Sequence, residues 1–277
     1  MASRLYPTTR WLFKQVVRSL RAFGLGAMLS PLVFGLMAIY ITGLLLLDRR
    51  QNGTRIADWL PARAHDALNR LLRTHELSTR AVMKAVIGWA KQLGSGYLVV
   101  DDVVVSKPFC KRSRWVGWTY STSEKRKVRG FHIVILLWCT GCWRIPVAFR
   151  LWRPKKSCRP KRYRKKSQLA WEMINDLDGD LTTIVLRKRS RWSIETLFRD
   201  AKQFSGLAAC QCRVDQALVR HVAFVLLAFI ILQRLRLHPK ETLGEVKDRL
   251  QRELITGGLP APAPLRGKVA AAQLLTA

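Results

Sequence analysis

The apolar positions of the first 94 residues recur at intervals of three or four, which is typical of amphipathic helices. Pro61 stands where a first-turn proline is favoured, and residues 62–72 after it predict one helix. Ser78 is placed as the N-cap of a second helix, which ends at Gly94. We expect residues 1–94 to form a helical N-terminal region, whose two helices serve either in packing or as a pair that reads DNA.

The pattern changes at residue 97, where β-branched and aromatic residues replace the helical spacing. Residues 97–105 read YLVVDDVVV, an apolar run with two aspartates at its centre, and predict a buried strand. Segments 128–138 and 142–152 predict two more strands joined by a tight hairpin at Thr140-Gly141. Pro146 in the third strand indicates that it lies at an edge of the sheet.

Residues 191–208 predict a helix with one apolar face and one charged face. Arg191, Glu195, Arg199 and Lys202 fall within an arc of about 80° at 100° per residue. One acid among three bases is typical of an exposed face with salt bridges, and it also suits a carboxylate that holds a metal ion beside DNA phosphates. The pattern as a whole predicts an α+β or α/β fold. We expect a helical region at 1–94, a mixed sheet flanked by helices at 95–236, and a C-terminal helix and tail at 237–277.

Composition narrows the class of protein. The 277 residues include 49 Lys and Arg against 18 Asp and Glu, a formal net charge of +31, and 49% of them are hydrophobic. Such a chain is not a disordered basic tail, because disorder combines high charge with low hydrophobicity. The charge indicates an anionic partner, either nucleic acid or a membrane surface. The six cysteines predict structural thiols in a reducing compartment. The first twenty residues show no signal-peptide cleavage site. The five histidines lack ligand spacing, so we expect no role for these histidines.

The basic residues are concentrated in the middle of the chain. Between residues 103 and 171 there are 19 Lys or Arg and one acid, Glu124, with aromatic residues interleaved. Basic groups with aromatic neighbours suit a phosphate backbone and unstacked bases. The predicted phosphate contacts from this segment are Lys155, Lys156, Arg162, Arg164, Lys165 and Lys166.

Residues 22–47 contain no charged side chain, and 26 such residues are long enough to cross a bilayer. Four glycines dilute this run, and Ser30-Pro31 can break it into two shorter helices. The segment is therefore either a membrane span or a buried pair of helices.

Several motifs together resemble one family. Arg191, Glu195 and Lys202 have the R-x3-E-x6-K spacing of the signature helix in DDE transposases of bacterial insertion sequences, the cut-and-paste group with a ribonuclease-H-like core. YLVVDDVVVSKPF resembles the strand that carries the first catalytic aspartate, and RIPVAFRLWRP resembles the third strand. RHVAFVLLAF looks like the continuation of the signature helix, and the N-terminal YITGLLLLDRRQNGTRIADWLP is also similar to this group. The resemblance thus covers nearly the whole chain, to about residue 250.

The resemblance implies a chemistry and a setting. Asp102 and Glu195 would be catalytic ligands of Mg²⁺ or Mn²⁺ in a two-metal site, and Arg191, Arg199 and Lys202 would contact phosphates. It further implies double-stranded DNA as partner, both transposon ends and target, a homodimer when functional, and a cytoplasmic protein associated with the nucleoid. In this group the region corresponding to residues 22–47 is helical and soluble, so membrane binding is not expected.

Two features depart from the family pattern. The tyrosine that normally precedes the signature arginine by three positions is replaced by Lys188. The second catalytic aspartate, its fourth strand and the following insertion are missing, because KSQLAWEMI joins directly to the approach of the glutamate helix near Ile174 and Asn175. The core is thus expected to be a truncated ribonuclease-H-like sheet. Asp176, Asp178 and Asp180 follow the junction, and Asp178 is the candidate third metal ligand.

Three functions are consistent with these observations. The first is a transposase that cleaves and transfers DNA strands at transposon ends. The second is a catalytically inactive, DNA-binding remnant of such an enzyme, which the missing aspartate favours. The third is a basic protein anchored to a membrane by residues 22–47.

Overall fold

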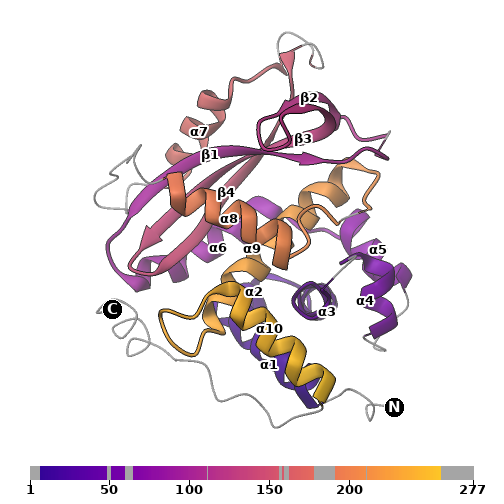
Figure 1. Cartoon of the computed structure of the whole chain (residues 1–277), viewed down its shortest axis with the longest axis vertical. Helices are drawn as coiled ribbons and strands as arrows, with labels where there is room; N and C mark the ends of the chain where they lie inside the picture. The colour runs from indigo at the N-terminus through magenta and orange to yellow at the C-terminus, as the bar shows by residue number, and fades with distance from the viewer. Residues whose placement is uncertain are drawn as a thin grey trace.

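The chain begins with helices, continues with an antiparallel sheet and ends with helices (Figure 1). The computed structural model describes residues 7–48, 51–59, 65–110, 112–155, 158, 162–177, 191–209 and 211–256. The N-terminal elements are α1 (Pro7–Ala22), α2 (Leu25–Met28), α3 (Pro31–Leu46), α4 (Gly53–Trp59), α5 (His65–Arg73), α6 (Thr79–Ala90) and the 3₁₀ turn η1 (Lys91–Leu93). The strands are β1 (Tyr97–Ser106), β2 (Gly117–Ser121), β3 (Arg126–Thr140) and β4 (Trp143–Trp152). The helices that follow are α7 (Lys166–Asn175), α8 (Arg191–Phe204), α9 (Asp215–Arg234) and α10 (Leu243–Thr256).

Helices α1 to α6 confirm the predicted helical N-terminal region. Ser78 caps α6 as expected, because its Oγ accepts a hydrogen bond from the backbone nitrogen of Ala81 at 3.2 Å. The helix predicted at 62–72 is α5, and positions 62–64 of that prediction lie outside the described residues. Helix α6 packs against β4 and α9, and α5 packs against α3 and α9. This arrangement favours packing over DNA reading for the pair.

The uncharged run at 22–47 is broken into α2 and α3, as the second alternative predicted. Pro31 opens α3, and the Oγ of Ser30 accepts a hydrogen bond from the backbone nitrogen of Val33 at 3.4 Å. Helix α3 packs against α9, where the hydroxyl of Tyr40 lies 3.0 Å from Nδ1 of His221. Among the described helices, α9 alone is long and apolar enough to cross a membrane, and 83% of its apolar window is buried inside the protein, as in a core helix.

Strand β3 is the centre of the sheet. It pairs with β1 along one edge and with β2 and then β4 along the other, and every described pairing is antiparallel. Gly130 pairs with both Ser106 of β1 and Gly117 of β2, and a Cβ there would lie 2.5 Å from the carbonyl oxygen of Val105. Strand β4 is an edge strand, as Pro146 predicted, and the register shifts beside it. Strand β2 was not predicted.

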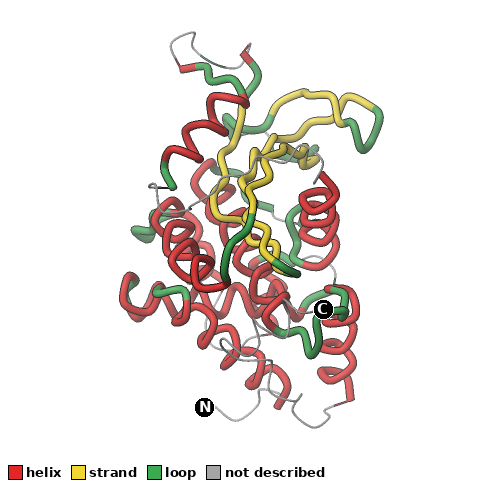
Figure 2. The backbone as a smooth tube through the Cα atoms, turned by 90° about the vertical axis from the view of Figure 1, so that its left-hand side faces the viewer, coloured by secondary structure: helices red, strands yellow, loops and turns green. Residues whose placement is uncertain are grey.

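Helices cover both faces of the sheet (Figure 2). Asp102, Val134 and Arg150 are register partners, so their side chains share one face, and α7 lies over that face. Helix α8 packs against β1 and β4 from the opposite face, where the thiol of Cys139 contacts Ser193. The sheet therefore lies between α7, which packs against β3 and β4, and α8.

The predicted α+β class, with a ribonuclease-H-like sheet flanked by helices, is confirmed. The sheet was expected to be mixed, whereas the described strands all pair antiparallel. One continuous core extends from Leu12 to Leu250 through the N-terminal helices, the sheet and α10, so the domain boundaries at 94 and 236 stay predictions. No strand follows β4 among the described residues, and within them the outer edge of β1 has no strand partner.

Candidate active site

The structure brings the two predicted catalytic acids to one cavity. Asp102 comes from β1, Glu195 comes from α8, and both line a cavity of about 600 Å³. Arg199 and Lys202 of α8 line the same cavity, as does Asp101. Acids and bases that are far apart in the sequence thus line one cavity.

Asp102 is held by two side chains through a single carboxylate oxygen. Its Oδ2 lies 3.1 Å from Nδ1 of His132 and 2.6 Å from Nζ of Lys166. Burial raises the pKa of Asp102, but the hydrogen bonds and charges of Lys166 and His132 outweigh burial, and the net pKa is lowered. Asp102 is therefore ionised at neutral pH and is already paired with an ammonium group.

The sequence assigned no role to His132, and the structure places its side chain against Asp102. Its side chain is 8% exposed, its Nδ1 contacts Asp102, and its Nε2 lies 2.6 Å from Oγ1 of Thr119. It pairs with Val104 in the β1–β3 register, two residues from Asp102 on the same face. The signal available in the sequence was a polar residue, His132, within an apolar strand. Only the strand register shows that this residue lies beside Asp102.

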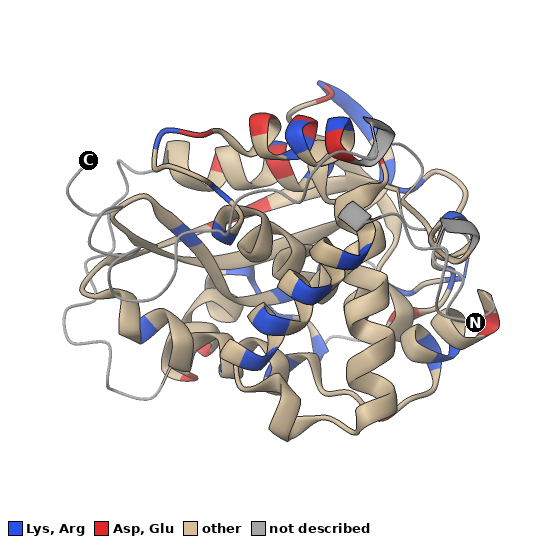
Figure 3. Cartoon of the chain, turned by 90° about the horizontal axis from the view of Figure 1, so that it is seen from below, with Lys and Arg blue, Asp and Glu red and all other residues tan. Residues whose placement is uncertain are grey.

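Lys166 differs from the other predicted phosphate contacts. It opens α7, and its Nζ lies over the ring of Trp152 at 4.8 Å as well as against Asp102. Lys156 lies outside the described residues. The remaining members of the predicted set are exposed: Lys155, Arg162, Arg164 and Lys165. Figure 3 shows that basic residues are spread over helices and strands alike.

Helix α8 has the two faces that its sequence predicted. Ile194, Leu197 and Ala201 are fully buried, and the side that carries Glu195, Arg199 and Lys202 turns to the cavity. Burial lowers the pKa of Lys202, and the nearby Glu124 raises it in part. The side chain of Arg191, the first residue of the helix, lies outside the described residues.

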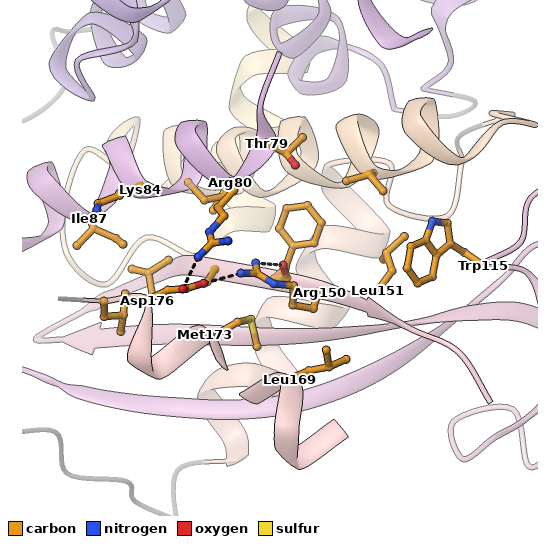
Figure 4. A pocket seen from close by; sticks show the side chains of 16 residues that line it. Thr79, Arg80, Lys84, Ile87, Trp115, Arg150, Leu151, Leu169, Met173 and Asp176 are labelled. Atoms are coloured by element: carbon orange, nitrogen blue, oxygen red, sulfur yellow. Dashed lines mark hydrogen bonds and ion pairs between the residues drawn. The ribbon is translucent and has the colours of Figure 1, made fainter. Parts of the chain in front are cut away.

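The third carboxylate of the site is not supplied by Asp176. That residue bridges Arg80 of α6 and Arg150 of β4, with its Oδ2 2.7 Å from Nη2 of Arg150. It lines a separate, mainly apolar cavity of about 370 Å³ between α6, β4 and α7 (Figure 4). Asp178 and Asp180 lie outside the described residues. Within the part of the chain that is described, no three Asp, Glu, His or Cys residues are grouped closely enough to hold a metal ion.

Comparison with protein families supports the motif analysis. A family described as DDE superfamily endonuclease matches residues 34–186, which include Asp102, and a family described as transposase DDE domain matches residues 142–231, which include Glu195. Comparison with curated proteins and with solved structures gave no match. The predicted resemblance to DDE transposases is confirmed. Because the first match covers more than half of the chain, the protein belongs to the DDE superfamily of endonucleases.

Proposed function

We propose that this protein binds DNA at transposon ends, cleaves a strand there in a reaction that depends on Mg²⁺ or Mn²⁺, and transfers that strand to a target. The observation that carries the proposal is the cavity shared by the carboxylates of Asp102 and Glu195 and the cations of Arg199 and Lys202. Acids that bind metal ions and bases that bind phosphates are the two requirements of such a site.

The residues present fit a divalent cation by their chemistry. Carboxylate oxygens are the ligands that Mg²⁺ and Mn²⁺ prefer, and Asp102 and Glu195 would hold the ion. When bound, such an ion activates a water molecule or hydroxyl for attack and stabilises the leaving oxygen. A second ion needs further ligands, and the described residues supply no group of three. We propose Asp178, close to the junction, as the third ligand.

The basic side chains have separate tasks in this proposal. Arg199 and Lys202, together with Arg191 at the start of α8, bind the phosphates on either side of the reacting bond through charge-assisted hydrogen bonds. The exposed basic residues at the end of β4 and before α7 bind the DNA backbone farther away: Lys155, Lys156, Arg162, Arg164 and Lys165. Lys166 and His132 orient Asp102 and keep it ionised.

We further propose that the protein acts on double-stranded DNA as a homodimer in the cytoplasm, associated with the nucleoid. The family and the net charge of +31 support this setting.

A second candidate function is DNA binding without cleavage. It is favoured by the outer edge of β1, which has no strand partner among the described residues, and by Lys166, whose ammonium already neutralises Asp102. Such a protein would hold DNA ends and compete with an active transposase for them.

Nicking of DNA that carries the gene's flanking ends, with Mg²⁺ or Mn²⁺, separates the two functions. If the site cleaves, Asp102→Asn and Glu195→Gln each lower the nicking rate by a factor on the order of 10² or more. Asp66→Asn is the matched control, because Asp66 is an acid of α5 that is 83% exposed and does not line the cavity. Salt-sensitive binding without nicking in either metal supports the second function, and nicking that persists in both acid variants refutes the proposed site.

A further inference from the structure

The hairpin formed by β2 and the first part of β3 extends beyond the rest of the sheet. Strand β2 pairs with residues 126–130 of β3, whereas β1 pairs with β3 only from residue 130 onward. Figure 1 shows β2 on the side of the sheet away from α10. We call residues 117–130 the arm. Residues 126–129 of the arm therefore pair with β2 but with neither β1 nor β4.

Alternation along β2 gives the arm two different faces. Thr119 contacts His132, and Ser121 is fully buried, with its Oγ 3.1 Å from Oγ of Ser123. Trp118 and Tyr120 point the other way and are 69% and 58% exposed. Two neighbouring exposed aromatic rings on one strand cost solvation free energy and contribute nothing to the core, so they indicate a binding surface.

The neighbours of these rings are basic. Arg129 is the register partner of Trp118, and Lys127 is the register partner of Tyr120. Arg129 is anchored, because its Nε donates to the carbonyl oxygen of Cys110 at 3.2 Å. The acid of the arm, Glu124, is paired with Arg126 at 2.9 Å. The surface thus combines flat rings with net positive charge, which complements bases attached to phosphates.

The arm is fixed relative to the candidate active site. Tyr120 lines the same cavity as Asp102 and Glu195, and Thr119 reaches Asp102 through His132. Alternate residues of a strand lie about 6.6 Å apart, which equals about two steps of 3.4 Å between stacked bases. A base held by these rings would therefore belong to a nucleotide close to the phosphate in the cavity.

We propose that the arm binds unpaired bases of a DNA end by stacking them on Trp118 and Tyr120. The inference rests on the proposed function and names the form of DNA that the site takes. Bases in an intact duplex are covered by their neighbours, whereas unpaired bases expose a face to an aromatic ring whatever their sequence. The basic partners Lys127 and Arg129 bind the backbone of the same strand.

The test is a comparison of three DNA probes by fluorescence anisotropy, with EDTA present so that no cleavage occurs. The probes are a blunt duplex, the same duplex with three unpaired thymidines at one end, and that duplex with three abasic nucleotides in their place. The full-length protein should bind the thymidine probe more tightly than the abasic probe by about 5-fold to 150-fold. Trp118→Ala should lose most of this preference, Tyr120→Ala should reduce it, and Trp118→Phe should retain part of it.

Trp171→Ala is the matched control, since Trp171 is 57% exposed on α7 and does not belong to the arm. Equal affinity of the wild type for the thymidine and abasic probes overturns the proposal, and so does a Trp118→Ala variant that keeps the preference or weakens all three probes equally. The nicking assay is independent of this result. A preference for the thymidine probe without nicking supports base stacking on the arm and refutes cleavage. Nicking without this preference refutes base stacking on the arm alone.

Discussion

The C-terminal helix stabilises α3 through a buried lysine, and this contact yields a sharp stability prediction. Lys247 of α10 is 1% exposed. Its Nζ lies within hydrogen-bonding distance of the carbonyl oxygens of Leu44, Leu45 and Leu47, at 3.2, 2.5 and 2.8 Å, at the C-terminus of α3. Helix ends leave carbonyl groups without partners inside the helix, so a donor supplied from elsewhere stabilises them. The contact ties two helices that are about 200 residues apart in sequence.

Burial lowers the pKa of Lys247 from 10.5 to about 7, although Asp48 raises it in part. Between these two values the unfolded chain binds a proton that the folded protein lacks, so the free energy of unfolding rises with pH. The slope is about 1.4 kcal/mol per pH unit, which gives roughly 2 to 3 kcal/mol between pH 7.5 and 9.5. Lys247→Met removes this pH dependence and also removes donors from buried carbonyls, at a cost of about 1 to 3 kcal/mol. The difference between wild type and variant should therefore grow as pH rises.

Urea unfolding followed by circular dichroism at pH 7.5, 8.5 and 9.5 measures this difference. Lys14→Met, at an exposed position of α1, is the control and should run parallel to the wild type. If the stabilities of wild type and Lys247→Met change in parallel with pH, Lys247 is not the group that titrates, and the reasoning fails.

Substitutions at three further positions test individual contacts. Asp176→Asn removes the charge that pairs with Arg80 of α6 and Arg150 of β4. Because the side chain of Arg150 is only 25% exposed, thermal unfolding should show a free energy of unfolding lower by about 1 to 3 kcal/mol. An unchanged Tm would contradict this. Tyr40→Phe removes the hydroxyl that lies 3.0 Å from His221 in the α3–α9 interface. Urea unfolding should show a free energy of unfolding lower by about 1 kcal/mol, and an unchanged value would contradict this. Ser78→Ala removes the N-cap of α6 and should cost about 1 kcal/mol, whereas Ser78→Asp should cost less, and equal losses for both would argue against capping.

The sequence was sufficient wherever local periodicity decides the structure. The run YLVVDDVVV predicted β1, the proline and cap signals predicted α3 and α6, and the apolar face of α8 placed Glu195 on the opposite side. These features depend on residues within one or two turns of each other or along a single strand. The family followed from the same local motifs, because their spacing is specific in combination.

Tertiary structure decided the partners of these residues. The pairing of Asp102 with His132 and Lys166, 30 and 64 positions away, depends on the β1–β3 register and on the placement of α7. The exposed rings of the arm could not be identified before β2 was known to pair with only the first residues of β3. A local pattern determines which face of an element a side chain occupies, but it carries no information on which distant element covers that face. Contacts over long sequence separations are set by how the elements pack, and for this reason the candidate site emerged only from the fold.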